Sequence, residues 1–218
     1  MSKLGMLGLG SFSTLFYIKE LNALYNAKHG GFSTCPFKML NVDFDTINNL
    51  LPNTSKALDA IVKDNLNKLK ALEIDTIVVP NITLHETIDR LSIEANIIHP
   101  VEETISNVKE NKHTNVTIFG TLYTMQSNYI TSKFRAEKIN VLQVSKEDKQ
   151  QIDDLRIAVY NGKENQKQLE IFNELINKYT ENGVVVLACT ELSVAYNIKN
   201  NLVYDMARIQ IKKSVNPL

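Results

Sequence analysis

A thiol, a hydroxyl and a carboxylate stand next to one another at the end of an apolar run in this sequence. The run reads GVVVLACTELS, over residues 183–193, and its polarity changes abruptly at Cys189, Thr190 and Glu191. A cysteine at the end of a buried strand and the start of a helix lies beside backbone N–H groups that stabilise a thiolate. The pattern indicates a group that can take up or release a proton. On residue type alone, a buried and inert thiol is the simpler interpretation, because free cysteine is among the most buried residues.

The composition restricts the class of protein. The chain has 218 residues, of which 44% are hydrophobic and 22% are charged, and its formal net charge is zero. These values are typical of a globular protein with one large or two small domains. A neutral chain has no basic field to hold nucleic acid or an anionic membrane, and no apolar run approaches the roughly 20 residues that span a bilayer. We therefore expect neither partner.

The cysteine content favours a cytoplasmic protein. Cys35 and Cys189 are too few for a disulfide framework, and they fit a reducing compartment. The apolar run at the N-terminus is broken by glycines and has no cleavage-like site, which favours a first strand over a signal peptide. No group of residues has the spacing of a zinc site, so we expect no metal.

Short apolar runs alternate with longer amphipathic segments along the whole chain. The pattern predicts strands over residues 3–10, 38–44, 75–80, 96–100, 115–120, 139–144, 184–188 and 201–205. It predicts helices over residues 13–29, 55–73, 85–95, 101–111, 124–138, about 149–162, 165–183, 190–200 and the C-terminal segment. This alternation is typical of an α/β protein with parallel sheets covered by helices. Such sheets bind ligands at the carboxyl ends of their strands.

A weak internal repeat indicates two similar α/β lobes. The segments DTIVVPNITLHET and GVVVLACTELSVA can be overlaid, which places Asn81 opposite Cys189. The segments LGLGSFST and IFGTLYTM form a second pair, each with a strand, a glycine and then hydroxyl residues. We expect two Rossmann-like lobes with a cleft between them, the first over residues 1–98 plus about 203–218 and the second over 99–202. The simpler interpretation is that all α/β units look alike.

Five short motifs carry a resemblance to a known superfamily. ACTEL is similar to the second catalytic motif, Gly-Cys-Thr-Glu, of the aspartate/glutamate racemases. FGTLYTMQSNY, STLFYIKELN, GGFSTCPFKMLNVDF and VYD resemble further motifs of that superfamily, and they occur in the same order over nearly the whole chain. The resemblance implies a cofactor-independent amino-acid racemase with two lobes, active as a homodimer. In that superfamily two groups, normally both cysteines, flank the α-carbon of an acidic amino acid.

Cys189 matches one of these two groups, and the surrounding motif favours catalysis over an inert thiol. The position of the other group is occupied by Asn81, in PNITLH, where the superfamily has Cys-Asn-Thr-x-His or Thr-Asn-Thr-x-His. An asparagine amide is neither an acid nor a base near neutral pH. Thr83 and His85 of the motif are retained. The two-thiol mechanism therefore does not transfer intact to this chain.

Three interpretations of this departure stay open. Cys189 can act as a racemase with another group, for which His85 and Cys35 are the candidates, or with water. The chain can instead be a single-cysteine decarboxylase or lyase of malonate-type substrates, in which the thiol protonates the enolate left by loss of carbon dioxide. It can also be an inactive protein that binds an amino acid.

We expect the remaining candidate residues to bind the substrate. Hydroxyl residues after the glycines of two predicted strands would form nests for carboxylates, and Lys163 resembles a lysine of the superfamily that meets a substrate carboxylate. The expected substrate-binding residues are Ser11, Ser13, Thr83, His85, Thr121, Thr124, Lys163, Thr190 and Glu191, with Cys189 and Asn81 as the catalytic positions. We expect the substrate to be a small amino acid or dicarboxylic acid. Thr54 stands where some aspartate racemases have a substrate-clamping arginine, which bears on substrate choice.

A dinucleotide-binding loop is the runner-up from a different class. GLGSFS at the end of the first predicted strand, followed by Asp43 after the second, imitates part of a dinucleotide fingerprint but lacks its third glycine. The racemase-like motifs account for the rest of the chain and this loop does not. We therefore expect no organic cofactor.

Overall fold

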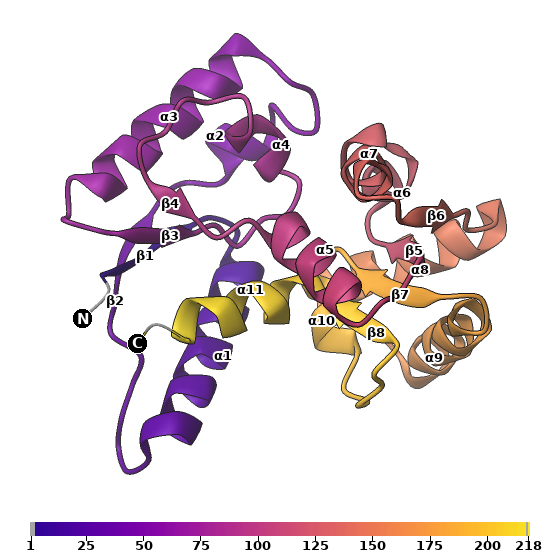
Figure 1. Ribbon diagram of the computed structural model, residues 1–218. Helices are drawn as coiled ribbons and strands as arrows, with labels where there is room; N and C mark the ends of the chain where they lie inside the picture. Colours follow the sequence, from indigo (N-terminus) through magenta and orange to yellow (C-terminus); the bar gives the residue numbers. More distant parts are fainter. Residues whose placement is uncertain (1–2, 217) are drawn as a thin grey trace. The chain divides into compact units, whose positions relative to one another are not determined.

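The computed structural model describes residues 3–216 and residue 218. Within them the chain forms two compact units, one of the described residues up to His99 together with those from Gln210 onward, and one of Pro100–Ile209. Each unit contains a four-stranded sheet in which every pair of neighbouring strands is parallel (Figure 1). The predicted α/β class with parallel sheets is confirmed. None of the helices in the described residues is both long and apolar enough to cross a bilayer.

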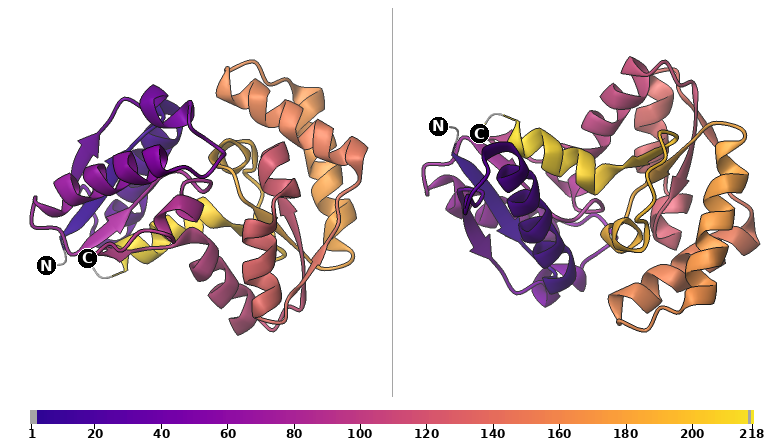
Figure 2. Two further views of the ribbon diagram at one scale, coloured as in Figure 1. Left: turned by 90° about the horizontal axis from the view of Figure 1, so that it is seen from above. Right: turned by 90° about the horizontal axis from the view of Figure 1, so that it is seen from below.

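The first unit contains the sheet β2-β1-β3-β4. Its elements are β1 (Leu4–Gly8), α1 (Ser11–His29), β2 (Phe37–Asn41), α2 (Asp45–Asn48), α3 (Lys56–Lys70), β3 (Thr76–Val78), α4 (His85–Ile88) and β4 (Asn96–Ile97). Figure 2 shows α3 in front of this sheet from above and α1 in front of it from below, so the two helices cover opposite faces. The apolar side chains of α3 recur at helical spacing and enter the core of this unit.

The second unit repeats the same topology with the sheet β6-β5-β7-β8. Its elements are α5 (Pro100–Glu110), β5 (Asn115–Phe119), α6 (Leu122–Gln126), α7 (Asn128–Ala136), β6 (Asn140–Leu142), α8 (Lys146–Tyr160), α9 (Gln166–Thr180), β7 (Val184–Leu187), α10 (Thr190–Ala195), β8 (Val203–Asp205) and α11 (Met206–Val215), which ends in the first unit. All four residues of β7 are buried. A strand that is apolar on both faces is what a central parallel strand requires.

The two sheets place the repeated segments at equivalent positions. β1 and β5 are second in their sheets, and β3 and β7 are third. Asn81 therefore follows the third strand of the first unit, as Cys189 follows the third strand of the second. The weak internal repeat of the sequence corresponds to two copies of one topology.

Two predicted helices end at least five residues before their sequence patterns indicate, and a third is divided in the structure. The helix expected over 85–95 ends at Ile88, because Leu91, Ile93 and Ala95 alternate along the chain and pack against the core of the first unit. The helix expected over 124–138 is divided at Ser127, whose backbone is extended. The helix expected over 190–200 ends at Ala195 because Tyr196 takes an extended conformation.

The C-terminal segment enters the first unit later than the sequence suggested. Residues from about 203 onward were expected there, but β8 pairs with β7 along Val185↔Val203 to Leu187↔Asp205. The chain returns to the first unit at Gln210. The side chain of Gln210 accepts a hydrogen bond of 2.6 Å from the Tyr17 hydroxyl and donates one of 2.6 Å to the Ile98 carbonyl.

Candidate functional site

Cys189 lies at the carboxyl end of β7, in the central part of the second sheet. Its backbone is extended and it directly precedes α10. The thiol is 9% exposed, and its sulfur lies 2.7 Å from Oε2 of Glu191, to which it donates a hydrogen bond. Glu191 is half-buried. The pattern CTE thus places a proton donor and a carboxylate acceptor in direct contact.

The surroundings of Cys189 favour the protonated thiol. Burial raises the pKa of Cys189 well above its ordinary value, and the negative charge and hydrogen bond of Glu191 raise it further. The positive charge of Arg156 and the backbone N–H of Glu191 act in the opposite direction. The site therefore holds a thiol whose proton has one defined acceptor.

Arg156 is part of this site, although sequence reasoning did not identify it. It lies on α8, which packs against α10, and its side chain is 24% exposed. Its Nε donates a hydrogen bond of 2.8 Å to Oδ1 of Asp153, which is itself buried. Burial alone would lower the pKa of Arg156, but the bond to Asp153 and the charges of Cys189 and Glu191 raise it. The one signal in the sequence was a basic residue about one helical turn from Ile152, Asp153 and Val159 in a predicted helix.

Two predicted hydroxyl residues lie at the same edge of the second sheet. Phe119 and Leu187 are register partners, so the residues that follow β5 and β7 are neighbours. Thr121 caps α6 by accepting a hydrogen bond of 3.0 Å from the Thr124 N–H, and the two hydroxyls lie 2.9 Å apart. A Cβ atom on Gly120 would lie 2.9 Å from the Thr124 side chain and 3.3 Å from the Ala188 carbonyl. This glycine therefore allows the threonine turn to lie against the residue before Cys189.

The turn after Cys189 is held by a buried polar network. Ser193 donates its backbone N–H to the Cys189 carbonyl at 3.2 Å, and its hydroxyl donates to Asp205 at 2.8 Å. Asp205 also forms an ion pair of 2.8 Å with Arg208, which donates a further hydrogen bond to the Ser193 carbonyl. The network joins α10 to the end of β8 and restricts the position of Cys189.

Lys163 is not placed with this group of residues. It follows the C-terminus of α8 in an exposed turn, and its backbone N–H donates to the Ala158 carbonyl at 2.8 Å. Arg156 lies one turn before the end of α8 at Tyr160, whereas Lys163 lies three residues beyond that end. Among the described residues, no side-chain contact joins Lys163 to Cys189 or Glu191.

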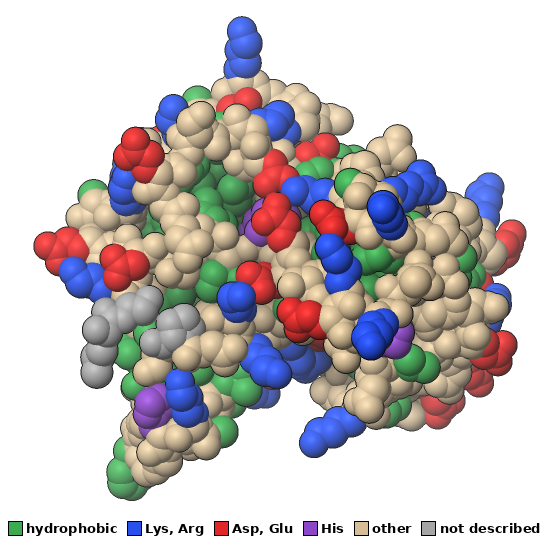
Figure 3. Space-filling view, viewed as in Figure 1, with side chains coloured by type: hydrophobic (Ala, Val, Ile, Leu, Met, Phe, Trp, Pro, Cys, Tyr) green, Lys and Arg blue, Asp and Glu red, His purple; other side chains and the backbone are tan. Residues whose placement is uncertain are grey.

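A surface hollow of about 530 Å³ lies between α5 and α7 in the second unit. Charged side chains gather over these two helices in Figure 3, and the ion pairs Lys133–Glu102 and Lys109–Glu137 connect them. The residues that line the hollow include neither a thiol nor a histidine. Two of its glutamates, Glu102 and Glu137, are engaged in these ion pairs, and the hollow contains no thiol–carboxylate pair like that of Cys189 and Glu191.

In the first unit, Asn81 shapes the turn after β3. Its side-chain Oδ1 accepts a hydrogen bond of 2.9 Å from the Leu84 N–H, and its carbonyl lies 2.8 Å from Nδ1 of His85. The amide nitrogen of the half-buried side chain has no hydrogen-bond partner in the part of the chain that the structure describes. Asn81 is therefore a turn-capping residue whose amide can still donate one further hydrogen bond.

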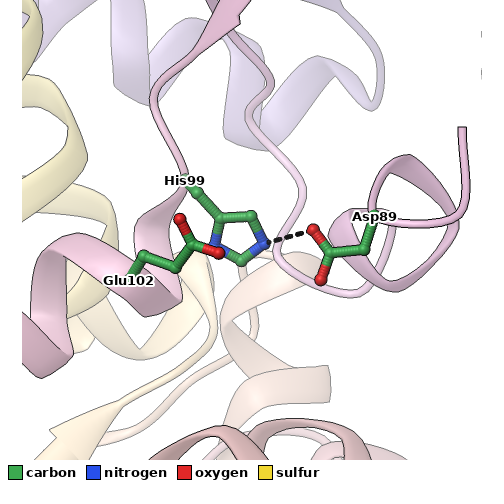
Figure 4. A group of neighbouring side chains, drawn as sticks. All are labelled: Asp89, His99 and Glu102. Atoms are coloured by element: carbon green, nitrogen blue, oxygen red, sulfur yellow. Dashed lines mark ion pairs between the residues drawn. The ribbon is translucent and has the colours of Figure 1, made fainter. Parts of the chain in front are cut away.

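His85 lies beneath this turn and is fully buried. Its ring packs edge-on against His99 at 4.8 Å between centroids, and Nε2 of His99 lies 3.3 Å from Oδ1 of Asp89 (Figure 4). Burial, together with the neighbouring His99, lowers the pKa of His85 to about 3. The ring is therefore neutral near pH 7, and its burial does not support the roles of substrate ligand or second acid–base group.

Ser11, Ser13 and Thr83 follow the carboxyl ends of β1 and β3, whereas Cys35 precedes β2 and lies at the opposite edge of this parallel sheet. Ser11 is exposed at the start of α1, and Ser13 is half-buried with its hydroxyl donating to the Gly10 carbonyl at 3.2 Å. Thr83 is half-buried in the turn that Asn81 caps. Cys35 is buried before β2, its N–H donates to Asn22 at 2.9 Å, and burial raises its pKa to about 11. A thiol with that pKa is a poor base near pH 7.

The fold and the thiol site define an α/β protein of two repeated units with a cysteine–carboxylate pair at a strand end. The sequence matches the family model for Asp/Glu/Hydantoin racemases over residues 6–213. The chain therefore belongs to this family. Comparison with curated proteins found no match.

Solved structures of similar proteins have the same fold over nearly their whole length. An aspartate racemase homologue from Pyrococcus horikoshii OT3 is 21% identical, with a TM-score of 0.87 and coverage of 100% of this chain and 99% of that chain. The aspartate racemase of Picrophilus torridus is 23% identical, with a TM-score of 0.75 and coverage of 98% and 94%. At these identities the likeness establishes the fold.

Proposed function

We propose that this protein transfers a proton at the α-carbon of an aspartate- or glutamate-type amino acid without an organic cofactor. Membership of the racemase family supports the reaction class. The observation that carries the proposal is the hydrogen bond of 2.7 Å between the Cys189 thiol and the Glu191 carboxylate. Such a pair supplies a nucleophilic sulfur together with an adjacent base that activates it.

The proposed chemistry has two successive proton transfers, the first from the Cys189 thiol to Glu191 and the second from the substrate to the Cys189 thiolate. The S–H bond of Cys189 breaks and its proton passes to Oε2 of Glu191, which leaves a thiolate. The thiolate then removes the α-proton of the substrate, and the electron pair of the broken C–H bond moves toward the substrate carboxylate. Return of the proton from sulfur restores the starting enantiomer, whereas inversion needs a donor on the opposite face. Asn81 cannot be that donor, because its amide does not ionise near neutral pH.

The test is exchange of the α-proton for deuterium. Each enantiomer of aspartate and glutamate is incubated with the protein in deuterated water, and proton NMR follows the α-proton signal. We expect loss of this signal with the wild-type protein, no loss with Cys189→Ala, and a rate about 10²-fold lower with Glu191→Gln, as is typical when a general base is removed. Polarimetry of the same samples separates exchange alone from inversion. Absence of exchange from all four amino acids would contradict the proposal.

Decarboxylation of a malonate-type acid is a second candidate, favoured by the protonation state of Cys189. Because burial holds this cysteine as a thiol, it is ready to protonate an enolate formed by loss of carbon dioxide, and a single acid suffices. This candidate would be supported if the wild-type protein releases carbon dioxide from malonate-type acids and the Cys189→Ala variant does not. If neither reaction occurs, a rise in melting temperature with an amino acid would instead indicate a binding protein.

A further inference from the structure

Arg156 has donor groups that the protein leaves unused. Its Nε is engaged by Asp153, but neither terminal nitrogen of its guanidinium has a hydrogen-bond partner within residues 3–216 and 218. A guanidinium presents its remaining N–H groups as a planar fork that matches a carboxylate. Placing a charged group in a half-buried position without partners for those N–H groups is costly. An anionic ligand would remove that cost.

The position of Arg156 is determined by its anchor. Asp153 is 6% exposed, and its Oδ1 accepts the Arg156 bond at 2.8 Å and a bond of 3.3 Å from the Leu122 N–H at the start of α6. Ile152 and Leu155, on the same helix, are buried in the core. The guanidinium is thus supported from α8 and α6 and has little freedom to turn away.

The environment of Arg156 is also that of the reacting thiol. α8 packs against α10, and the charge of Arg156 acts on both Cys189 and Glu191. Glu191 offers a negative charge to an ammonium group, while Arg156 offers a positive fork to a carboxylate. An amino-acid zwitterion carries these two groups on the one carbon whose proton Cys189 would remove.

We propose that Arg156 binds a carboxylate of the substrate beside Cys189, held in position by Asp153. The inference rests on the proposed function for the identity of the substrate as an amino acid, but not for the presence of a carboxylate site. Bidentate charge-assisted bonds give Arg156 both affinity and orientation for the ligand. A lysine at this position would keep the charge and lose the fork.

The first experiment compares two alkylating reagents at Cys189, independently of any enzymatic activity. Iodoacetate carries a carboxylate and iodoacetamide is its neutral analogue. The rate with iodoacetate divided by the rate with iodoacetamide therefore reports a carboxylate-binding group next to the thiol. Peptide mass spectrometry separates Cys189 from Cys35. We expect Arg156→Gln to lower the ratio about tenfold or more, which corresponds to the loss of one charge-assisted bond. Lys146→Gln, which removes an exposed positive charge from the same helix, should leave the ratio unchanged.

Each outcome of this experiment bears on the inference. An unchanged ratio in Arg156→Gln would overturn it. An equal fall in both rates would also overturn it, because Arg156 would then only lower the pKa of the thiol. If Arg156→Gln does not fold, Arg156→Lys replaces it in the same experiment. This variant keeps the charge and should lower the ratio by a smaller factor than the tenfold expected for Arg156→Gln.

A second experiment separates this inference from the proposed function. Where α-proton exchange occurs, Arg156→Gln should raise KM at least tenfold, with a smaller change in kcat. Exchange with an unaltered KM in the variant would overturn the role of Arg156 and leave the proposed function intact. A lowered alkylation ratio in a protein without exchange would support the carboxylate site and contradict the proposed function.

Discussion

At the scale of single residues, Asn81 has a structural role at a position where the sequence predicted a catalytic one. Its side chain caps the turn after β3 through the Leu84 N–H. Asn81→Ala should therefore lower the free energy of unfolding by about 1 kcal/mol, as the loss of a similar cap does. Asn81→Asp keeps the acceptor oxygen and should remain close to wild type. Urea denaturation of both variants measures the difference, and equal stability of Asn81→Ala and wild type would contradict the capping role.

His85 makes the stability of the first unit depend on pH. Its pKa is lowered from 6.5 to about 3 by burial and His99, with a smaller opposing effect of Asp89. The unfolded chain then binds a proton that the folded chain does not, so the contribution of His85 is complete above about pH 6.5. It is lost as the pH falls toward 3, with a slope of up to about 1.4 kcal/mol per pH unit.

A matched pair of variants measures this dependence. His85→Asn keeps a donor near the position of Nδ1, facing the Asn81 carbonyl, and should flatten the loss of stability between pH 6.5 and pH 4. His29→Asn, at an exposed position on α1, should retain the wild-type slope. Urea unfolding at successive pH values gives both slopes. An unchanged slope in His85→Asn would rule out a neutral buried His85 as its cause.

At the scale of elements, the short helix α10 depends on tertiary contacts. It has only six residues, too few to be stable alone, and the Ser193 hydroxyl links it to Asp205. Ser193→Ala should destabilise the protein by about 1–2 kcal/mol, because a buried bond is lost and a carboxylate oxygen loses a donor. It should also slow α-proton exchange, since Ser193 contacts the Cys189 carbonyl.

Val194→Ala provides the control for this prediction. Val194 is on the same helix and half-buried, and it takes no part in the polar network. Thermal melting and exchange rates of the two variants should differ, with the larger loss of exchange in Ser193→Ala. Equal effects in the two variants would mean that packing, and not the network, positions Cys189.

At the scale of the whole molecule, the C-terminal part of α11 completes the first unit. Gln210 is fully buried, and it satisfies both the Tyr17 hydroxyl and the Ile98 carbonyl. Gln210→Leu would remove both of these buried hydrogen bonds, which should cost about 2 kcal/mol. Hydrogen exchange followed by mass spectrometry should show faster exchange in the first unit and little change in the second.

Gln166→Met is the control for the change at position 210. Gln166 is exposed at the start of α9 and hydrogen-bonds only to Glu170 among the described residues. Its substitution should leave exchange unchanged in both units. Equally faster exchange across both units in Gln210→Leu would show that they unfold as one cooperative body.

The amino-acid sequence by itself determined the fold class, the strand positions and the thiol–carboxylate pair of Cys189 and Glu191. These features depend on local patterns: an apolar run such as Val184–Leu187 predicts a buried strand wherever it is placed, and the motif CTE joins a thiol to a carboxylate through adjacent residues. The repeat was visible for the same reason, since each unit restates the order of strand, turn and helix.

Only the tertiary structure decided the surroundings of these residues. Arg156 lies on a helix far along the chain from Cys189, and no local pattern records that α8 packs against α10. The burial of His85 and the pairing of β8 with β7 are likewise set by distant segments. Helices end early at Ile88 and Ala195 because packing against the rest of their units outweighs a helical propensity of a few tenths of a kcal/mol per residue. The burial of a side chain and the charges around it depend on all of its neighbours in space. A local sequence pattern identifies only the neighbours along the chain.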